Sequence, residues 1–297
     1  EQSQTRFDQA VKAIWGTAKQ GAITHLGKGR LLSGATLEEA LHMLDIKPDV
    51  CGDVRWIHRH VKGADWYFVT PLKQASFNGK VKFKAQGAAE LWNPVTGEIT
   101  PLKVEREGEY ATVQLDMPKA GSCFVVFNHD KKQKNPEAVT YKHTQSIEGK
   151  WLVEFPEGWG AAPRLEIETL VPWCNMPLSE EGKAFSGSVT YSTTFQMPDE
   201  SKQLMLDLGK VSMIAEVTLN GKKLRTLWCT PYTLDITNDV KSGDNTLQVK
   251  VTSTWFKRLV YDAALPEADR KTWTISGPSA GSPLKEYGLL GPVTLKY

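Results

Sequence analysis

Strand periodicity dominates this chain from residue 52 onward, and that feature restricts the fold more than any other. In residues 215–251, AEVTLNGKKLRTLWCTPYTLDITNDVKSGDNTLQVKV, apolar and polar residues alternate on both sides of Asn220-Gly221. Asn-Gly supplies the two positive-φ residues of a two-residue hairpin turn, and SGDN at 242–245 is a second turn signal that interrupts the alternating pattern. The stretch therefore predicts antiparallel strands of a β-sheet.

Similar short segments fill residues 51–145, and turn residues separate them. They read RWIHRHVKGADWYFVTP, KVKFKA, ELWNPVTGEITPLKV, YATVQLDM and CFVVFN. Strands at this spacing predict a β-sandwich, whose packing would include Trp56, Trp66 and Trp92. The polar stretch HDKKQKNPEAVTYKHTQ places the domain boundary near residue 145, and a second β-sandwich follows over 146–297.

Helical periodicity is confined to residues 1–50. The apolar positions with helical spacing fall into two stripes: Phe7, Ala10, Val11 and Ile14, then Leu37, Ala40, Leu41 and Leu44. A strand around Leu31-Leu32 lies between them, Thr36 with Glu39 predicts a capping box, and Pro48 ends the second helix. Because such a small unit cannot bury its own apolar faces, we interpret it as the tail of a larger α/β domain in a longer protein. We expect it to dock on the first sandwich or to be poorly ordered.

Composition excludes several classes of partner. With 297 residues, 40% hydrophobic and 24% charged, the chain has room for about two domains and a sizeable core. The net charge of +2 with interspersed signs offers no basic stripe, so we expect neither a nucleic-acid nor a membrane partner. No apolar run approaches the roughly 20 residues that span a bilayer, and the first residues lack the apolar core of a signal peptide.

Catalytic and metal-binding patterns are weak. The cysteines have no C-x-x-C spacing and are interpreted as isolated buried thiols: Cys51, Cys123, Cys174 and Cys229. All six histidines lie at or before His143, so the second half has no imidazole for a Ser-His-Asp triad or a zinc site. GKGRLLSG lacks the spacing of a phosphate loop. Acids that could serve a glycosidase are interpreted as solvated surface groups: Glu166, Glu168, Asp262, Glu267, Asp269 and Glu286. We therefore assign no catalytic residue, no metal and no cofactor.

The segment from Trp255 to Tyr287 is too long for an ordinary sandwich loop and is rich in aromatic and charged residues. Sugars favour an aromatic face beside hydrogen-bonding groups, so the segment predicts a carbohydrate-binding or domain-interface surface. The predicted site residues are Trp255, Arg258, Asp262, Trp273 and Tyr287. The alternative is structural, with Trp255 in the core and an Arg258–Asp262 salt bridge that anchors the loop. Trp173 and Trp228 are interpreted as core or edge-strand residues.

Several segments resemble known glycoside hydrolases. VTYSTTFQMP, LDLGKV, AEVTLNGK, PYTLDIT and GDNTLQVKVT, in this order, resemble the galactose-binding-like jelly roll of these enzymes. TSTWFKRLVYDAALP, YGLLGPVTL, WIHRHVKGADWYFVTP, ELWNPVTGEI and LGKGRLLSGATLEEALHMLDIKPDV resemble the C-terminal region of family 106, the α-L-rhamnosidases. The similarity covers essentially the whole chain.

The resemblance implies a mostly β fold of two β-sandwiches, the second a galactose-binding-like jelly roll, preceded by a short α/β remnant over residues 1–50. It implies an upstream catalytic barrel of the same polypeptide as partner, which holds the family's catalytic carboxylates and calcium ligands. We therefore expect an accessory C-terminal portion, inactive alone, that supports the barrel and contacts oligosaccharide of plant or other complex glycans. The implied location is periplasmic or extracellular in a bacterium. The alternatives are an independent carbohydrate-binding module and a purely structural spacer.

Overall fold

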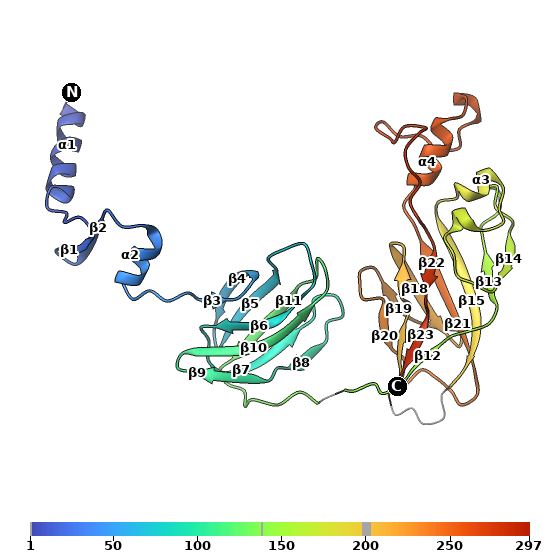
Figure 1. Cartoon of the computed structure of the whole chain (residues 1–297), viewed down its shortest axis with the longest axis horizontal. Helices are drawn as coiled ribbons and strands as arrows, with labels where there is room; N and C mark the ends of the chain where they lie inside the picture. Colours follow the sequence, from blue (N-terminus) through green and yellow to red (C-terminus); the bar gives the residue numbers. More distant parts are fainter. Residues whose placement is uncertain (1, 138, 198–202) are drawn as a thin grey trace. The chain divides into compact units, whose positions relative to one another are not determined.

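The chain folds into two compact units, Glu1–Pro136 and Glu137–Tyr297, in a computed structural model that describes residues 2–137, 139–197 and 203–297 (Figure 1). Both units are built mainly from antiparallel strands. The predicted mostly β fold is confirmed.

The first unit begins with two helices on either side of a β-hairpin. The elements are α1 (Gln2–Trp15), β1 (Ala22–Leu26), β2 (Gly29–Ser33) and α2 (Leu37–Met43). The prediction of a single strand in this segment missed β1, which pairs antiparallel with β2. The turn between them uses Gly27 at a φ of 58°, a conformation open to glycine without steric cost.

The predicted capping box at the start of α2 is confirmed. The hydroxyl of Thr36 accepts from the backbone N–H of Glu39 at 3.2 Å, and the Glu39 carboxylate accepts from the backbone N–H of Thr36 at 2.8 Å. The apolar stripes of the two helices remain open to solvent, with Phe7 62% and Leu37 70% exposed. Residues 1–50 therefore do not bury their own apolar faces, as their small size predicts.

Two antiparallel sheets form the first sandwich, in the orders β3-β6-β10-β9 and β4-β5-β11-β7-β8. The strands are β3 (Val50–Cys51), β4 (Val54–Val61), β5 (Ala64–Pro71), β6 (Phe77–Phe83), β7 (Ala88–Trp92), β8 (Ile99–Pro101), β9 (Val104–Glu107), β10 (Tyr110–Met117) and β11 (Cys123–Asn128). Side chains that face inward from both sheets, among them Tyr67, Val113 and Val125, are fully buried.

Two of the three tryptophans of the first sandwich, Trp66 and Trp92, are not where the sequence predicts them. By contrast, the Trp56 ring lies 6.4 Å from that of the core residue Tyr67. Trp66 and Trp92 lie outside the interior cluster of buried residues, and Trp56 is 39% exposed. The cause is strand alternation: Tyr67 and Val69 take the inward positions of β5, so Trp66 must point to the opposite side of the sheet.

The second sandwich has sheets in the orders β12-β23-β16-β20 and β14-β13-β15-β21-β18-β19, with a separate pair β17-β22. The strands are β12 (Thr144–Ser146), β13 (Trp151–Glu154), β14 (Arg164–Ile167), β15 (Ser188–Gln196), β16 (Met205–Asp207), β17 (Lys210–Val211), β18 (Ile214–Leu219), β19 (Lys222–Leu227), β20 (Thr233–Asp235), β21 (Asp244–Thr252), β22 (Leu289–Gly291) and β23 (Thr294–Lys296). Short helices η1 (Trp173–Asn175) and α3 (Glu180–Lys183) lie between β14 and β15. Trp151, Trp173 and Tyr191 are among its largest buried side chains.

The predicted hairpin at Asn220-Gly221 is confirmed. Asn220 and Gly221 have φ of 51° and 82°, and they join β18 to β19. Two consecutive positive φ values match the right-handed twist of the flanking strands.

The second unit begins earlier than the predicted boundary near residue 145. β12 pairs with β23 at the end of the chain, and the backbone N–H groups of Lys142 and His143 both donate to the carbonyl of Tyr297 at 2.8 Å. These bonds tie the polar segment before residue 145 to the second sandwich, and the units divide after Pro136.

The long segment after β21 is not a plain loop. It contains helix α4 (Phe256–Ala263) and the 3₁₀ turn η2 (Glu267–Asp269), which the prediction of a long loop missed. The helical spacing of Phe256, Leu259, Val260 and Ala263 spans only about two turns, so it was overlooked within a stretch interpreted as a loop.

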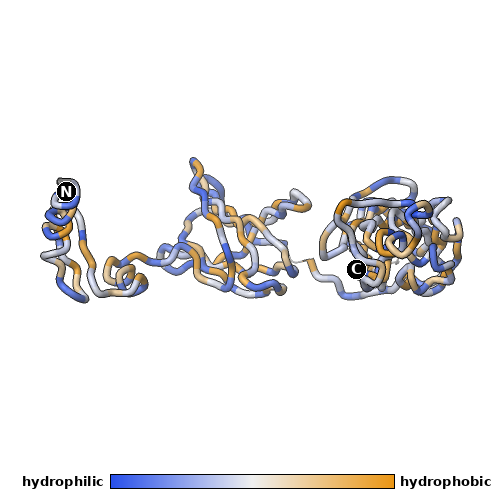
Figure 2. The backbone as a smooth tube through the Cα atoms, turned by 90° about the horizontal axis from the view of Figure 1, so that it is seen from above, coloured by the Kyte–Doolittle hydropathy of each residue, from blue (hydrophilic) through white to orange (hydrophobic). Residues whose placement is uncertain are grey.

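Hydropathy changes at short intervals along the backbone (Figure 2). Across the described residues, none of the helices combines the length and the apolar character needed to cross a bilayer.

Candidate functional site

Arg258, on α4, is the centre of the predicted site, and it is buried, with 1% of its surface exposed. Its Nη2 lies 2.7 Å from Oδ1 of Asp262, one helical turn away, and its Nη1 lies 2.9 Å from Oε1 of Glu181. The guanidinium also lies over the rings of Trp159 and Tyr261, at 5.3 and 5.2 Å from their centroids. Burial opposes the charge, but the bonds to Asp262 and Glu181 raise the pKa of Arg258 above its usual value.

Asp262 fastens the middle of the long segment to α4. Its Oδ2 accepts from the backbone N–H of Lys271 at 3.1 Å and from the N–H and hydroxyl of Thr272 at 2.7 and 2.6 Å. Although burial opposes it, the bonds from Arg258 and Thr272 lower the pKa of Asp262. The predicted alternative, an Arg258–Asp262 salt bridge that anchors the loop, is thus present.

Glu181 joins this network from α3, and sequence reasoning missed it. Its Oε1 accepts from Lys271 Nζ at 2.8 Å as well as from Arg258, and these two bonds lower the pKa of Glu181. Lys271 Nζ also donates to the carbonyl of Gly158 at 2.7 Å. One local sequence feature could have indicated the start of α3: Ser179, whose hydroxyl caps the helix by accepting from the backbone N–H of Gly182.

Tyr287 and Lys257 form a second buried group beside α4. Tyr287 is 2% exposed, and its hydroxyl bonds that of Thr254. Lys257 is fully buried with its Nζ 5.2 Å from the centre of the Tyr287 ring, and that Nζ has no hydrogen-bond partner among the described residues. Burial lowers the pKa of Lys257, which the neighbouring Cys174 partly counteracts.

Only two of the five predicted site residues have a large exposed surface. Trp273 is 77% exposed and Trp255 is 45% exposed, with the Trp255 ring 5.2 Å from that of Trp159. A small cavity lies beside Trp273, and its polar lining includes Asp262, Arg270 and Thr272. The structure thus separates a buried charge network from an exposed aromatic edge, and it is the edge that offers an aromatic face beside polar groups.

The other two tryptophans of this sandwich have different environments. Trp173 is fully buried and donates from Nε1 to the hydroxyl of Tyr191 at 2.6 Å, as expected of a core residue. Trp228 follows β19 and is exposed.

A titratable cluster in the first sandwich was also missed. Asp65 accepts from His58 Nε2, His60 Nδ1 and His129 Nε2 at 2.8–2.9 Å. The other ring nitrogen of His58 lies 2.8 Å from Oδ2 of Asp49. Although burial opposes it, the three imidazole bonds lower the pKa of Asp65. The histidines alternate along β4 and meet His129 only through sheet pairing, which no local pattern reveals.

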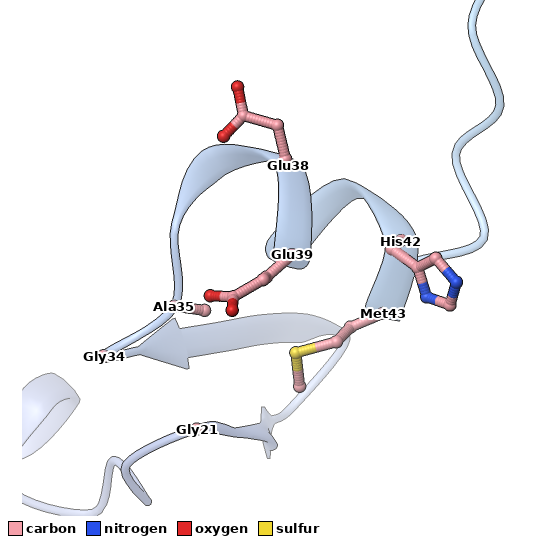
Figure 3. A pocket seen from close by; sticks show the side chains of 7 residues that line it. All are labelled: Gly21, Gly34, Ala35, Glu38, Glu39, His42 and Met43. Atoms are coloured by element: carbon pink, nitrogen blue, oxygen red, sulfur yellow. The ribbon is translucent and has the colours of Figure 1, made fainter.

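A shallow hollow lies between α2 and the hairpin of the first unit (Figure 3). Its lining residues are Gly21, Gly34, Ala35, Glu38, Glu39, His42 and Met43. Glu39 points toward Ala35, where the capping box engages it, and Glu38 points away from the strands (Figure 3). Because its lining includes no Trp, Tyr, Lys or Arg, we assign no ligand to it.

Within the described residues, no group of three or more His, Cys, Asp or Glu side chains is placed to hold a metal ion. Glu166 pairs with Lys150 at 3.3 Å and Glu286 with Lys210 at 2.7 Å. The cysteines are free, but the prediction of buried thiols holds only for Cys123, whose pKa burial raises to about 12.

Comparison with known proteins identifies two regions. Residues 1–106 match the family 106 glycoside hydrolase model, described as alpha-L-rhamnosidase. Residues 182–281 match a model described as a glycosyl hydrolase 2 galactose-binding domain-like region. A putative beta-glucuronidase from Formosa agariphila is 45% identical over 125 residues, which are 40% of this chain and 11% of that protein.

The similarity extends over both units in one solved structure. The rhamnosidase from Novosphingobium sp. PP1Y matches 99% of this chain with a TM-score of 0.85 and 29% sequence identity. The match covers 29% of that rhamnosidase, so the chain spans less than a third of its length.

Proposed function

We propose that this chain, a relative of the family 106 glycoside hydrolases with a galactose-binding-like region, is the accessory C-terminal portion of an α-L-rhamnosidase-like enzyme. One observation carries the proposal: the structural match to a rhamnosidase covers 99% of this chain, but the same match covers only 29% of that rhamnosidase. In this proposal the partner is a catalytic barrel of the same polypeptide, and the two sandwiches support it. The substrates would be plant or other complex glycans, met outside the cytoplasm of a bacterium in polysaccharide degradation.

The electrostatics of the acids support an accessory role. A glycosidase needs a carboxylic acid that stays protonated near neutral pH, which requires a raised pKa. In the long segment and its contacts the shifts go the other way, because bonds to Lys or Arg lower the pKa of Glu181, Asp262 and Glu286. Lysine and arginine thus favour the charged form of these carboxylates, which suits a structural role, and we expect the chain to hydrolyse nothing by itself.

The exposed edge at Trp273 favours a second role, carbohydrate binding. A pyranose can rest its C–H face on an indole while its hydroxyl groups bond polar neighbours such as Thr272 and Arg270. An independent carbohydrate-binding module would use this edge without any barrel, and a purely structural spacer would not use it.

Removal of this chain from the natural full-length enzyme tests the accessory role. The proposal expects the remaining portion to lose thermal stability and turnover of an aryl α-L-rhamnoside. Full retention of both would refute the supporting role.

Affinity electrophoresis of the 297-residue chain in gels containing a rhamnose-rich pectic polysaccharide tests the binding role. Retardation that Trp273→Ala abolishes, while Trp228→Ala keeps it, would establish the edge as a sugar site. Trp228 is the matched control because it is an exposed tryptophan outside the long segment. Equal mobility with and without polysaccharide would refute sugar binding and leave support of the barrel.

A further inference from the structure

The five-stranded sheet of the first sandwich carries an apolar row on the side turned away from the sandwich interior. Strand pairing places five residues side by side across β4, β5, β11, β7 and β8: Ile57, Phe68, Phe124, Trp92 and Ile99. We call these residues the outer row. At the usual strand spacing of about 4.8 Å, it is about 19 Å long.

The outer row is distinct from the core. The inward residues of the same strands, such as Val69 and Val125, belong to the interior cluster, and the outer-row residues do not. Phe68 contacts Phe124 with ring centroids 5.1 Å apart, and beside the row Trp66 meets Trp92 edge to face at 4.8 Å.

The two ends of the outer row are open. Ile57 is 55% exposed and Ile99 is 53% exposed. A sheet face that meets water normally carries polar residues, whereas strands that are apolar on both faces are covered on both. An apolar row across all five strands therefore marks a face that another surface covers.

The chemistry of the outer row favours a protein over a sugar chain. Sugar hydroxyl groups need hydrogen-bond partners, and the one donor in the row, Trp92 Nε1, already donates to Glu90 at 3.1 Å. The other oxygen of Glu90 accepts from Lys131 at 2.7 Å. A glycan laid along the row would find donors only at its β4 end, where the exposed Arg55 and Arg59 flank Ile57, whereas an apolar protein surface needs none along the rest of the row.

Chain connectivity points to the protein domain that would cover the row. Six residues separate α2 from β3, a reach of about 25 Å at most. Two residues separate β3 from β4, which carries Ile57 at the edge of the row. The segment 1–50, with its exposed apolar stripes, is thus tethered close to this edge.

We propose that the outer row is the docking surface for the α/β domain to which residues 1–50 belong. The exposed Arg55 and Arg59 lie on β4 on either side of Ile57, so the partner surface should be apolar with acidic residues opposite them. The inference rests on the proposed function, because it takes that domain to be the catalytic barrel of the longer protein.

Site-specific labelling compares the 297-residue chain with the natural full-length protein. Ile57→Cys and Ile99→Cys, each in a Cys51→Ser background, are treated with a maleimide, and peptide mass spectrometry reads the rate at each site. The control is Gln114→Cys, because Gln114 is exposed on β10 in the other sheet. We expect labelling at 57 and 99 to be slower in the full-length protein by about tenfold or more, because it would require local opening, and labelling at 114 to be unchanged.

Equal labelling of the outer row in both proteins overturns the inference, as does equal slowing at position 114. Slowing in the 297-residue chain on addition of a rhamnose-rich pectic polysaccharide also overturns it, in favour of a sugar site. Turnover of an aryl α-L-rhamnoside is measured on the same full-length samples. If the full-length protein is active but positions 57 and 99 label as fast as in the 297-residue chain, the docking surface alone is refuted. If labelling at these positions is slowed but the full-length protein is inactive, the proposed function alone is refuted.

Discussion

Replacement of Arg258 by Ala is expected to destabilise the second unit by about 3 kcal/mol. Loss of one partner of a buried ion pair costs about 3–5 kcal/mol, because the other charge stays buried without compensation. Asp262 keeps three hydrogen bonds from Lys271 and Thr272, which places the expected value at the lower end. For a unit of this size, the change corresponds to a fall in melting temperature of about 6–12 °C.

Hydrogen exchange of peptides from β15 and β21 reports the stability of this unit separately from the first. Arg164→Ala is the control, because Arg164 is exposed on β14 and its loss should change the free energy of unfolding by less than about 0.5 kcal/mol. Arg258→Lys should recover only part of the loss, since an ammonium group cannot bond both carboxylates in the geometry of the guanidinium fork. A loss below about 1 kcal/mol for Arg258→Ala would refute the reasoning that this network anchors the long segment.

Three further predictions concern stability and reactivity. The imidazole bonds lower the pKa of Asp65, so the ionised Asp65 stabilises the first unit above the unfolded pKa of about 3.9, and this stabilisation is lost as the pH falls through the lower folded pKa. Asp65→Asn should therefore reduce the loss of stability of the first unit in an acid titration. An unchanged pH profile in the variant would contradict this. Gly221→Ala should lower the free energy of unfolding by about 1 kcal/mol in a denaturant titration, because Gly221 has a φ of 82°. Gly281→Ala is the control and should be neutral, because Gly281 lies in open space without a positive φ. Equal losses in the two variants would show that alanine is not strained in the turn. Cys51 should react with a thiol reagent at pH 8 much faster than Cys123, which is buried with its pKa raised to about 12, and comparable rates would place Cys123 at the surface.

Local patterns were enough to predict the sandwiches. Period-two alternation and the Asn220-Gly221 dipeptide act between neighbouring residues, so the sequence predicts strands and turns directly. The capping box at Thr36 and Glu39 is local in the same way. These features needed no knowledge of which strands pair.

The site depended on contacts that no local pattern contains. Glu181 meets Arg258 across 77 positions of sequence, and His129 meets Asp65 across 64. Arg258 and Asp262 have i,i+4 spacing, but the short helix that makes this spacing meaningful was overlooked although its apolar residues have helical spacing. The aromatic run WYF in β5 predicts a strand, yet only sheet pairing shows that Phe68 aligns with Ile57 and Phe124 on the outer side.

The most direct test of the proposed function is release of 4-nitrophenol from 4-nitrophenyl α-L-rhamnoside, measured side by side for the natural full-length protein and for the 297-residue chain at equal molar concentration. The account predicts turnover by the full-length protein and none above the uncatalysed rate by the chain. Turnover by the chain alone, abolished by a point substitution within it, would contradict the account, and so would a folded full-length protein without activity on any α-L-rhamnoside.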